Sequence, residues 1–359
     1  WYGTFLVKMK QFKIIGLMSG TSLDGLDLVY VNFELDEYWK FEIINSKTYT
    51  YEKKWIGFLQ NISKEKITSI SKIDLDYTKL LSKYIMEFIS EFSIEDIDFI
   101  SSHGHTALHQ PSNSLTYQIG NLPMLAKYIN QKVVCDFRVQ DVELGGQGAP
   151  LVPVGEQYLF PEYTTFINLG GFANITKRIK NNIIAYDICP INIVFNHLSR
   201  SIDLKYDKKG YIASTGNLNE NLYNNLQRLS YYIQDPPKSL GIEWIDYKIY
   251  PILANFSDIA TEDLMNTFSN HFAFQIAKNI GDQHKVLITG GGAYNDYLIE
   301  RIKNLTNSEI TIPDSKIIEY KEAVIFSFLG LLRMLKINNC YSSVTGAQMD
   351  HCSGKIYNP

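Results

Sequence analysis

The residues that could do phosphate chemistry begin with the segment Ser19 to Gly25, SGTSLDG. It lies between two strand-like apolar runs, at 13–18 and 26–33. The successive backbone N–H groups of Gly20, Thr21 and Ser22 can form an anion-binding nest with two hydroxyls beside it. A Walker A loop is excluded because no lysine follows and the next residues favour a strand. The loop predicts phosphate binding, and a hairpin with solvated polar residues is the alternative.

Two carboxylates, Asp24 and Asp27, accompany this loop. Carboxylates this close to a phosphate would repel it unless a hard cation lay between them. Magnesium, which usually retains several waters, is the natural choice. We therefore expect Asp24 and Asp27 to hold Mg²⁺, directly or through water.

Two further glycine loops occur, at Gly170–Gly171 and at Gly290–Gly292. The second follows a strand-like run and precedes a helical pattern, so a nucleotide could approach its backbone closely and meet the positive end of a helix. The dinucleotide pattern GxGxxG is absent from all three loops, which disfavours a nicotinamide enzyme. Together the loops indicate ATP held in a cleft between two domains.

Asp187 is the candidate general base. It ends an apolar, strand-like run and precedes a proline turn in AYDICPIN. An aspartate with an ordinary pKa near 3.9 is ionised at neutral pH and can take a proton from water or a hydroxyl. A helix cap or a turn residue is the alternative role.

Arg138 and Asp141 precede a loop that contains Gly145, Gly146 and Gly148. An arginine can grip a carboxylate or the hydroxyls of a polar ligand, while glycines allow the backbone to approach it. An intramolecular ion pair beside a flexible loop is the alternative.

His103, His105 and His109 have a spacing that places side chains on one face of a strand. No carboxylate or cysteine at matching spacing supports a metal cluster there. We expect structural or ligand-binding histidines instead.

Elements that position these residues repeat along the chain. A strand, a loop of small residues and a second strand occur at 13–33 and again at 165–179, which indicates an internal duplication. Helical periodicity covers 80–92, and 322–335 is apolar almost all round, as in a buried helix. This alternation predicts an α/β protein with helix-covered sheets.

Composition excludes several classes of protein. Lys and Arg total 34 against 38 Asp and Glu, giving a net charge of −4, which argues against a nucleic-acid binder. No apolar run approaches the roughly 18 residues of a membrane span. The four cysteines indicate neither a disulfide framework nor a zinc ribbon and fit a reducing cytoplasm. We read residues 1–8 as an upstream extension rather than a signal peptide and expect the natural start at Met9.

These segments together resemble the anhydro-N-acetylmuramic acid kinase family. The matching motifs follow in family order from Met9 onward: IGLMSGTSLDGLD at 15–27, SHGHT at 102–106, YQIGN at 117–121, DFRVQDVELGGQGAPLVP at 136–153, INLGGFANIT at 167–176, YD.CP.N at 186–192, PPKSLG at 236–241, TGGGAYN at 289–295 and SVTGA at 343–347.

The resemblance implies two RNase H-like lobes of the actin, Hsp70 and sugar-kinase type, with ATP in the cleft between them, and a homodimer. We expect the first lobe to comprise 9–140 plus 340–359 and the second 141–339. The family recycles peptidoglycan in the cytoplasm. It uses ATP and Mg²⁺ to phosphorylate O6 of 1,6-anhydro-N-acetylmuramic acid while water opens the anhydro ring, giving N-acetylmuramic acid 6-phosphate.

By this resemblance each candidate residue receives a role. Asp187 would activate the water, and a further set would line the sugar site: His103, Arg138, Asp141, Gly146, Gln147 and Glu322. The ATP site would comprise Gly20, Thr21, Ser22, Asp24, Gly25, Gly170, Gly171, Gly290, Gly291 and Gly292.

The sequence departs from the family pattern around the predicted base. Ile188, Cys189 and Ile191 stand where a threonine and two glycines are usual, so we expect loop shape or sugar contacts to differ. His105 replaces the usual glutamine of the HGQT segment. Two alternatives therefore stay open: a kinase for another amino sugar or polyol, and a nucleotide-binding pseudoenzyme that acts through a partner.

Overall fold

The computed structural model describes residues 10–20, 23–180 and 182–359, and these form two compact units. Unit 1 comprises the described chain up to Pro161 together with Tyr320–Pro359, and unit 2 is Glu162–Glu319. Within the described helices, none is long and apolar enough to cross a membrane.

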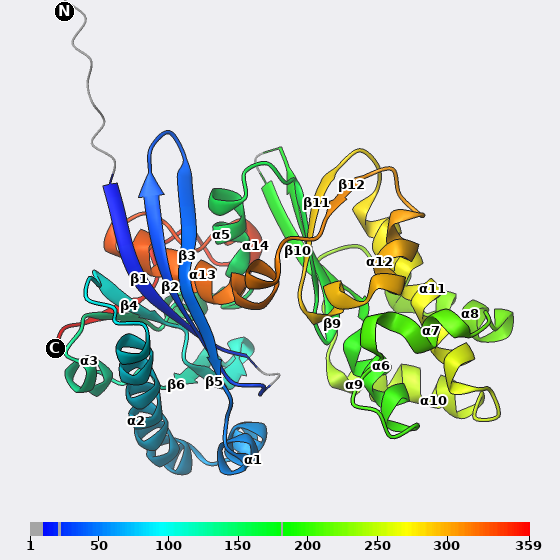
Figure 1. Ribbon diagram of the computed structural model, residues 1–359, viewed down its shortest axis with the longest axis horizontal. Helices are drawn as coiled ribbons and strands as arrows, with labels where there is room; N and C mark the ends of the chain where they lie inside the picture. Colours follow the sequence, from blue (N-terminus) through cyan, green and yellow to red (C-terminus); the bar gives the residue numbers. More distant parts are fainter. Residues whose placement is uncertain (1–9, 21–22, 181) are drawn as a thin grey trace, which may run out of the picture. The chain divides into compact units, whose positions relative to one another are not determined.

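Unit 1 contains a six-stranded sheet in the order β13-β7-β4-β1-β2-β3. Strands β1, β2 and β3 are antiparallel neighbours, whereas β4 and β7 run parallel to β1 (Figure 1). The bounds are β1 (Lys10–Ser19), β2 (Leu26–Leu35), β3 (Trp39–Tyr49), β4 (Phe99–Ser102), β7 (Val133–Cys135) and β13 (Lys355–Tyr357), and a separate hairpin is made of β5 (His105–Gln110) and β6 (Leu115–Ile119).

Helices cover both faces of this sheet. The helices of unit 1 are α1 (Lys53–Asn61), α2 (Ile67–Glu91), α3 (Met124–Ile129), α4 (Val139–Glu143), α5 (Val152–Leu159), α13 (Ser315–Met334) and α14 (Ser342–Thr345). On one face, Ile15 and Leu17 of β1 share a core with Leu81 and Phe88 of α2. On the other face α13 lies so close that a Cβ on Gly16 would collide with Ser327. Successive side chains of β1 point to opposite faces of the sheet, so one set packs against α2 and the other against α13.

Unit 2 repeats the same topology. Its sheet has the order β10-β9-β8-β11-β12, with β8, β9 and β10 antiparallel and with β11 and β12 parallel to β8. The bounds are β8 (Thr165–Leu169), β9 (Phe172–Ile179), β10 (Asn182–Pro190), β11 (Lys285–Thr289) and β12 (Glu309–Thr311). The shared strand order is what an internal duplication into two RNase H-like lobes predicts, and the α/β class is confirmed.

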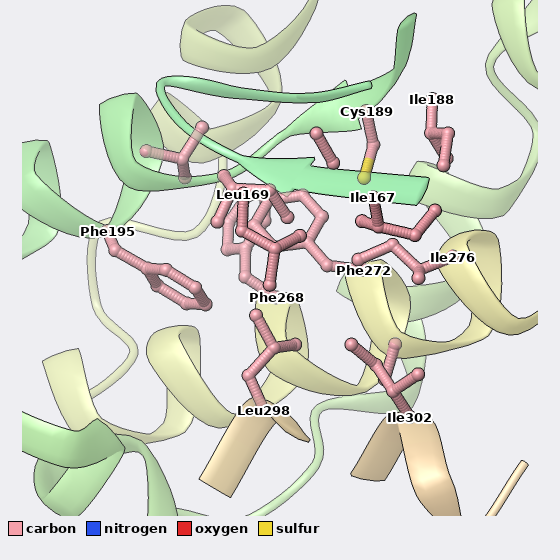
Figure 2. Packing of buried hydrophobic residues seen from close by; sticks show 14 of the residues in the cluster. Ile167, Leu169, Ile188, Cys189, Phe195, Phe268, Phe272, Ile276, Leu298 and Ile302 are labelled. Atoms are coloured by element: carbon pink, nitrogen blue, oxygen red, sulfur yellow. The ribbon is translucent and has the colours of Figure 1, made fainter. Parts of the chain in front are cut away.

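The core of unit 2 lies between its sheet and α11 (Thr261–Ile280). Phe268 and Phe272 of α11 pack with Ile167 and Leu169 of β8, as Figure 2 shows. The other helices are α6 (Asn192–Arg200), α7 (Tyr211–Thr215), α8 (Glu220–Gln227), α9 (Ile242–Trp244), α10 (Tyr250–Ala254) and α12 (Asp296–Lys303).

Some bounds differ from those expected from the sequence. The units divide at 161/162 and 319/320, whereas the predicted lobe boundaries lie at 140/141 and 339/340. The reason is visible in the contacts of the two intervening segments. Glu156 of α5 forms a buried ion pair with Lys321 of α13, and Asp141 bonds to Thr345, so both segments pack within unit 1.

Helix lengths were only partly predictable. The helix expected at 80–92 begins thirteen residues earlier, because Ile70 and Tyr77 extend its buried face through a polar stretch. The apolar helix expected at 322–335 is present as α13.

Candidate functional site

The first glycine loop connects β1 to β2 in unit 1. Thr21 and Ser22, two of its predicted phosphate contacts, lie outside the described residues. Of the residues on either side, Leu23 donates its N–H to Gly20 O over 3.5 Å, and Leu23 has a φ of 59°. A Cβ on Gly25 would lie 2.6 Å from Tyr49 O, so only glycine lets the loop enter β2 this close to β3.

The two predicted magnesium ligands flank this turn. Asp24 is exposed, and Asp27 is half-buried on β2, where its Oδ1 accepts a hydrogen bond of 2.6 Å from Thr48 Oγ1. Both offer hard oxygen donors of the kind that Mg²⁺ prefers, and the exposure of Asp24 leaves room for retained waters. Their role as metal ligands stays a prediction.

A buried chain of hydroxyl groups supports the start of the loop, and sequence reasoning missed it. Ser19 Oγ lies 2.7 Å from Tyr51 Oη and 2.9 Å from His105 Nδ1, and Tyr51 Oη lies 2.6 Å from Tyr77 Oη. Burial lowers the pKa of His105 to about 4 and raises the pKa of Tyr51 to about 12, so both are neutral at pH 7. No local pattern joins residues so far apart in sequence.

Arg138 and His103 form one unit of the predicted sugar site. Arg138 Nε–H donates to His103 Nε2 over 3.0 Å, and Arg138 Nη1 donates to Gly148 O over 2.6 Å. His103 Nδ1 lies 2.9 Å from Gly104 O, which fixes the tautomer that leaves Nε2 as an acceptor. Burial, then the Arg138 charge, lowers the pKa of His103 well below its usual value. Neutral His103 therefore holds the guanidinium in place.

The guanidinium keeps donors available for a ligand. It lies over the Phe326 ring, 5.7 Å from the centroid, and the His103 ring lies 4.5 Å from the same ring. No described residue accepts a hydrogen bond from its Nη2 group. Arg138 is only half-buried, so Nη2 can meet a polar ligand.

Asp141 is fully buried and bonded within the protein. Its Oδ2 accepts from Gly148 N–H over 2.7 Å, and its Oδ1 accepts from Thr345 Oγ1 over 2.7 Å. A Cβ on Gly146 would collide with this carboxylate. Asp141 therefore shapes the 145–148 loop, on which Gln147 is exposed, and its direct contact with a sugar stays a prediction.

Glu322 lies half-buried on α13, within the electrostatic reach of Arg138. Burial raises the pKa of Glu322, while the charges of Lys321 and Arg138 lower it. The structure thus brings neutral His103 together with the charged side chains Arg138 and Glu322 in unit 1. The Phe326 ring packs against His103 and Arg138.

In unit 2 the two glycine loops lie at one edge of the sheet. Strands β8 and β11 are parallel, with Thr289 opposite Asn168, so Gly170–Gly171 and Gly290–Gly292 follow neighbouring strand ends. Asn192 joins them, since its Nδ2 donates to Leu169 O over 3.1 Å and lies 3.6 Å from a Cβ built on Gly292.

The third glycine loop begins a short helical turn. Gly291 begins a single 3₁₀ turn, Gly291–Tyr294, so the first N–H groups of that turn have no partner within it. Gly290 has a φ of 82°, and its missing Cβ avoids Asn168 Oδ1. The expected helix begins only after this turn, at Asp296 with Asn295 as its cap.

Asp187 lies on β10 at an irregularity in its pairing with β9, between Asp187 and Cys189. Its Oδ2 accepts from Leu240 N–H over 2.9 Å, and Tyr231 Oη donates to its carbonyl over 2.7 Å. Asp187 N–H donates to Lys238 O, so the PPKSLG segment holds the aspartate through both backbone and side chain. Burial raises the pKa of Asp187, and the Leu240 hydrogen bond opposes that rise.

The three departures from the family pattern have buried side chains. Ile188, Cys189 and Ile191 are at most 1% exposed, and all three side chains belong to the core of unit 2. Figure 2 shows Ile188 and Cys189 in this core. The expectation that they alter sugar contacts finds no support in these positions. Ile191 instead anchors the second glycine loop, because its N–H donates to Gly171 O over 2.8 Å.

Comparisons with known proteins cover nearly the whole chain. A family model described as "Anhydro-N-acetylmuramic acid kinase" matches residues 12–359. The protein of that name from Sulfurimonas denitrificans is 32% identical over 372 residues, with 97% of this chain and 100% of that protein covered. Its namesake from Vibrio vulnificus strain YJ016 is 31% identical over 363 residues, covering 96% and 97%.

A solved structure, "Activator of the 2-Hydroxyisocaproyl-CoA Dehydratase from Clostridium difficile with bound ADPNP", matches with a TM-score of 0.46 and 16% identity. The match covers 92% of this chain and 99% of that chain.

Proposed function

Since this chain belongs to the anhydro-N-acetylmuramic acid kinase family, we propose that it phosphorylates O6 of 1,6-anhydro-N-acetylmuramic acid with ATP while water opens the anhydro ring. The product is N-acetylmuramic acid 6-phosphate. The observation that carries the proposal is Asp187, a carboxylate held at a strand irregularity by Leu240 N–H and linked by its strand to the second glycine loop.

The position of Asp187 on β10 leaves room for a sugar beside the second glycine loop. Asp187 precedes Pro190 by three residues, and Ile191 bonds to Gly171 of the glycine loop. Three residues of extended strand span roughly 10 Å. The carboxylate would therefore face the anomeric carbon from the side of the attacking water, without contacting the nucleotide phosphates that we assign to the Gly171 loop.

The bond changes follow from these positions. Asp187 accepts a proton from water as the water oxygen bonds to the anomeric carbon, and the bond between that carbon and O6 breaks. O6 then takes the γ-phosphoryl group, and ADP leaves. Burial raises the pKa of Asp187 and so makes it a stronger base than an ordinary aspartate.

The remaining residues position the reactants. We assign the loop of Gly20, Asp24 and Gly25 in unit 1 to the γ-phosphate, and the loops of Gly171 and Gly291 in unit 2 to the nucleotide phosphates. Arg138 would bind the sugar through Nη2, with His103 as the residue that orients it. Phosphoryl transfer asks mainly for such positioning and for charge stabilisation.

Magnesium fits Asp24 and Asp27, because both are carboxylates and Asp24 is exposed. When bound it would neutralise charge on the phosphates. We further propose a homodimer and a cytoplasmic location. The ATP cleft between lobes stays a prediction.

The decisive experiment is a coupled ADP-release assay over a panel of anhydro sugars, amino sugars and polyols, with and without Mg²⁺. We expect ADP release only with 1,6-anhydro-N-acetylmuramic acid and Mg²⁺, and a sugar 6-phosphate in equal amount by mass spectrometry. If another sugar is strongly preferred, the protein is instead a kinase for that amino sugar or polyol. ATP binding without turnover on any sugar would favour a pseudoenzyme.

A further inference from the structure

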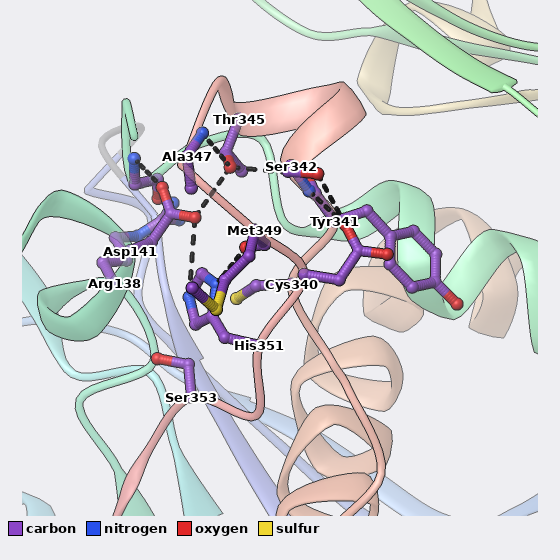
Figure 3. A network of polar contacts seen from close by, with 12 residues as sticks. Arg138, Asp141, Cys340, Tyr341, Ser342, Thr345, Ala347, Met349, His351 and Ser353 are labelled. Carbon is purple, nitrogen blue, oxygen red and sulfur yellow. Dashed lines mark hydrogen bonds and ion pairs between the residues drawn. The ribbon is translucent and has the colours of Figure 1, made fainter. Parts of the chain in front are cut away.

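Three potential metal ligands meet inside unit 1, apart from the predicted magnesium carboxylates. They are Asp141 of α4, Cys340 and His351, and their ligand atoms all lie within 4.8 Å of one another (Figure 3). Asp141 and Cys340 are 0% exposed and His351 is 5% exposed. We propose that this triad binds one divalent ion of the zinc class, which joins the C-terminal segment to α4.

The imidazole of His351 is prepared for a metal. Its Nδ1 lies 3.1 Å from Met349 O, which places the proton on Nδ1 and leaves a lone pair on Nε2. Metal-binding histidines usually donate their other ring N–H to such a carbonyl. Within the described part of the chain, His351 Nε2 is buried with no hydrogen-bond partner.

That lone pair faces a negatively charged oxygen. His351 Nε2 lies 3.6 Å from Asp141 Oδ1, beyond hydrogen-bond distance. Two acceptors facing each other in a buried space repel unless a cation lies between them. Either a proton on Nε2 or a metal ion could remove this repulsion. The Cys340 sulfur is a third potential ligand, and a thiolate beside a carboxylate and an imidazole favours the metal.

The backbone holds the two C-terminal ligands side by side. Cys340 N–H donates to His351 O and His351 N–H donates to Cys340 O, each over 3.1 Å. Residues paired in this way place their side chains on one face. The Cys340 sulfur donates to Phe137 O over 3.9 Å, which is a weak interaction, and it also lies within reach of the Ser353 hydroxyl.

Asp141 can bind an ion without giving up its present partners. Thr345 Oγ1 and Gly148 N–H each donate to one of its oxygens, and each carboxylate oxygen has a second lone pair. Donors of this kind orient a metal-binding carboxylate from the outer shell. The ion would thus share Asp141 with the 145–148 loop.

Charge and proton balance are consistent with this site. Binding breaks the Cys340 S–H bond, releases that proton to solvent and forms a sulfur–metal bond, with no change of oxidation state. Thiolate, carboxylate and neutral imidazole then balance a divalent ion, so the buried site is neutral overall. Zinc ligands lie roughly 2.0–2.3 Å from the ion, so the three side chains need to close by about 1 Å. A water would complete the tetrahedron.

The test measures metal in the full-length protein, purified without a histidine tag under reducing conditions. We expect about one zinc ion per chain, and Co²⁺ substitution should give a thiolate-to-metal charge-transfer band. Cys340→Ser and His351→Gln should each weaken zinc binding at least about tenfold. Cys352→Ser is the matched control, because this neighbouring half-buried thiol is outside the triad, and it should bind zinc as the unaltered protein does.

The proposal can also be tested on the unaltered protein, in case the variants fold poorly. For the unaltered protein without nucleotide, a zinc chelator should lower the melting temperature, and zinc but not Mg²⁺ should restore it. Unchanged zinc affinity in Cys340→Ser, or no zinc binding and a protonated His351 by NMR in the unaltered protein, would overturn the proposal. Because the readouts are metal content and melting temperature, failure here leaves the kinase assay unaffected.

Discussion

Leu240 N–H donates a 2.9 Å hydrogen bond to Asp187 Oδ2, which ties the PPKSLG segment to the proposed base. The two residues are 53 positions apart in sequence. Burial raises the pKa of Asp187, whereas this hydrogen bond stabilises the ionised carboxylate and lowers it. The PPKSLG segment therefore limits the rise in the pKa of Asp187.

Replacing the base should separate chemistry from binding. Asp187→Asn keeps the size of the side chain but cannot accept the water proton, so we expect turnover to fall by roughly 10²–10⁴-fold. A general base acts in the transition state and does not contact ATP in the ground state. The affinity for ATP should therefore stay within about twofold of that of the unaltered enzyme. Coupled ADP release and calorimetric ATP titration measure the two. Retained turnover would remove the water-activating role.

The pH dependence of turnover should report Asp187. The base works only when deprotonated, so activity is lost as pH falls through its pKa, and burial places that limb above the ordinary aspartate value. Leu240→Pro removes the N–H donor, and a hydrogen bond to a charged group contributes about 1.5–3 kcal/mol. The acid limb should therefore move up by roughly one to two pH units.

Leu240→Ala is the control for this shift, because it shortens the side chain and keeps the N–H group. Its pH profile of kcat/KM should match that of the unaltered enzyme. Equal shifts in both variants would mean that the leucine side chain, and not the hydrogen bond, matters.

Much of this arrangement follows from local sequence, and its long-range part does not. The strands at 13–18 and 165–169 were predictable because β-branched runs end at small residues, and β1 and β8 are present there. Asp187 was identified at the end of an apolar strand. The Leu240 contact was not foreseen, because it depends on a loop that returns from far along the chain.

The division into units differs from the predicted lobe boundaries for a related reason. Asp141 accepts hydrogen bonds from Gly148 N–H and Thr345 Oγ1, and these long-range contacts hold the 145–148 loop within unit 1. Substitutions at Ile188 and Cys189 looked like changes to a ligand loop, yet the strand irregularity sends both side chains into the core. Sequence shows which residue differs and not where its side chain points.

Arg138 should matter for the sugar and not for the nucleotide. Arg138→Lys removes the Nε–H bond to His103 and the donors on Nη2. A lost hydrogen bond to a charged group costs about 1.5–3 kcal/mol, so KM for the sugar should rise by roughly tenfold or more. Arg178→Lys in unit 2, where the guanidinium lies over Phe166, is the control. Steady-state kinetics should show ATP KM unchanged in both.

The buried ion pair between Lys321 and Glu156 should dominate local stability. Its atoms lie 2.7 Å apart and both side chains are at most 5% exposed. Lys321→Met leaves Glu156 buried without the Lys321 ammonium, and breaking such a pair costs about 3–5 kcal/mol. Urea unfolding would measure this loss. The double variant with Glu156→Leu should recover most of it, and a double variant no more stable than Lys321→Met would contradict this explanation.

The hydroxyl chain behind the first loop should govern phosphate binding. Tyr51→Phe removes the hydroxyl that contacts both Ser19 Oγ and Tyr77 Oη. Because Ser19 directly precedes the loop, we expect KM for ATP to rise severalfold while KM for the sugar stays unchanged. Ser19 Oγ keeps its contact with His105 Nδ1, but the loss of both hydrogen bonds of the Tyr51 hydroxyl should also lower the free energy of unfolding by about 1–3 kcal/mol.

Tyr49→Phe is the matched control for Tyr51→Phe, because the Tyr49 hydroxyl donates to Glu91 over 3.5 Å and forms no hydrogen bond with Ser19. It should leave both KM values unchanged. A purely structural role for Tyr51 predicts lower stability with unaltered KM for ATP, and that outcome would contradict the proposed positioning of the loop. A rise in KM for ATP in Tyr51→Phe alone would show that the hydroxyl chain holds the phosphate loop in its binding conformation.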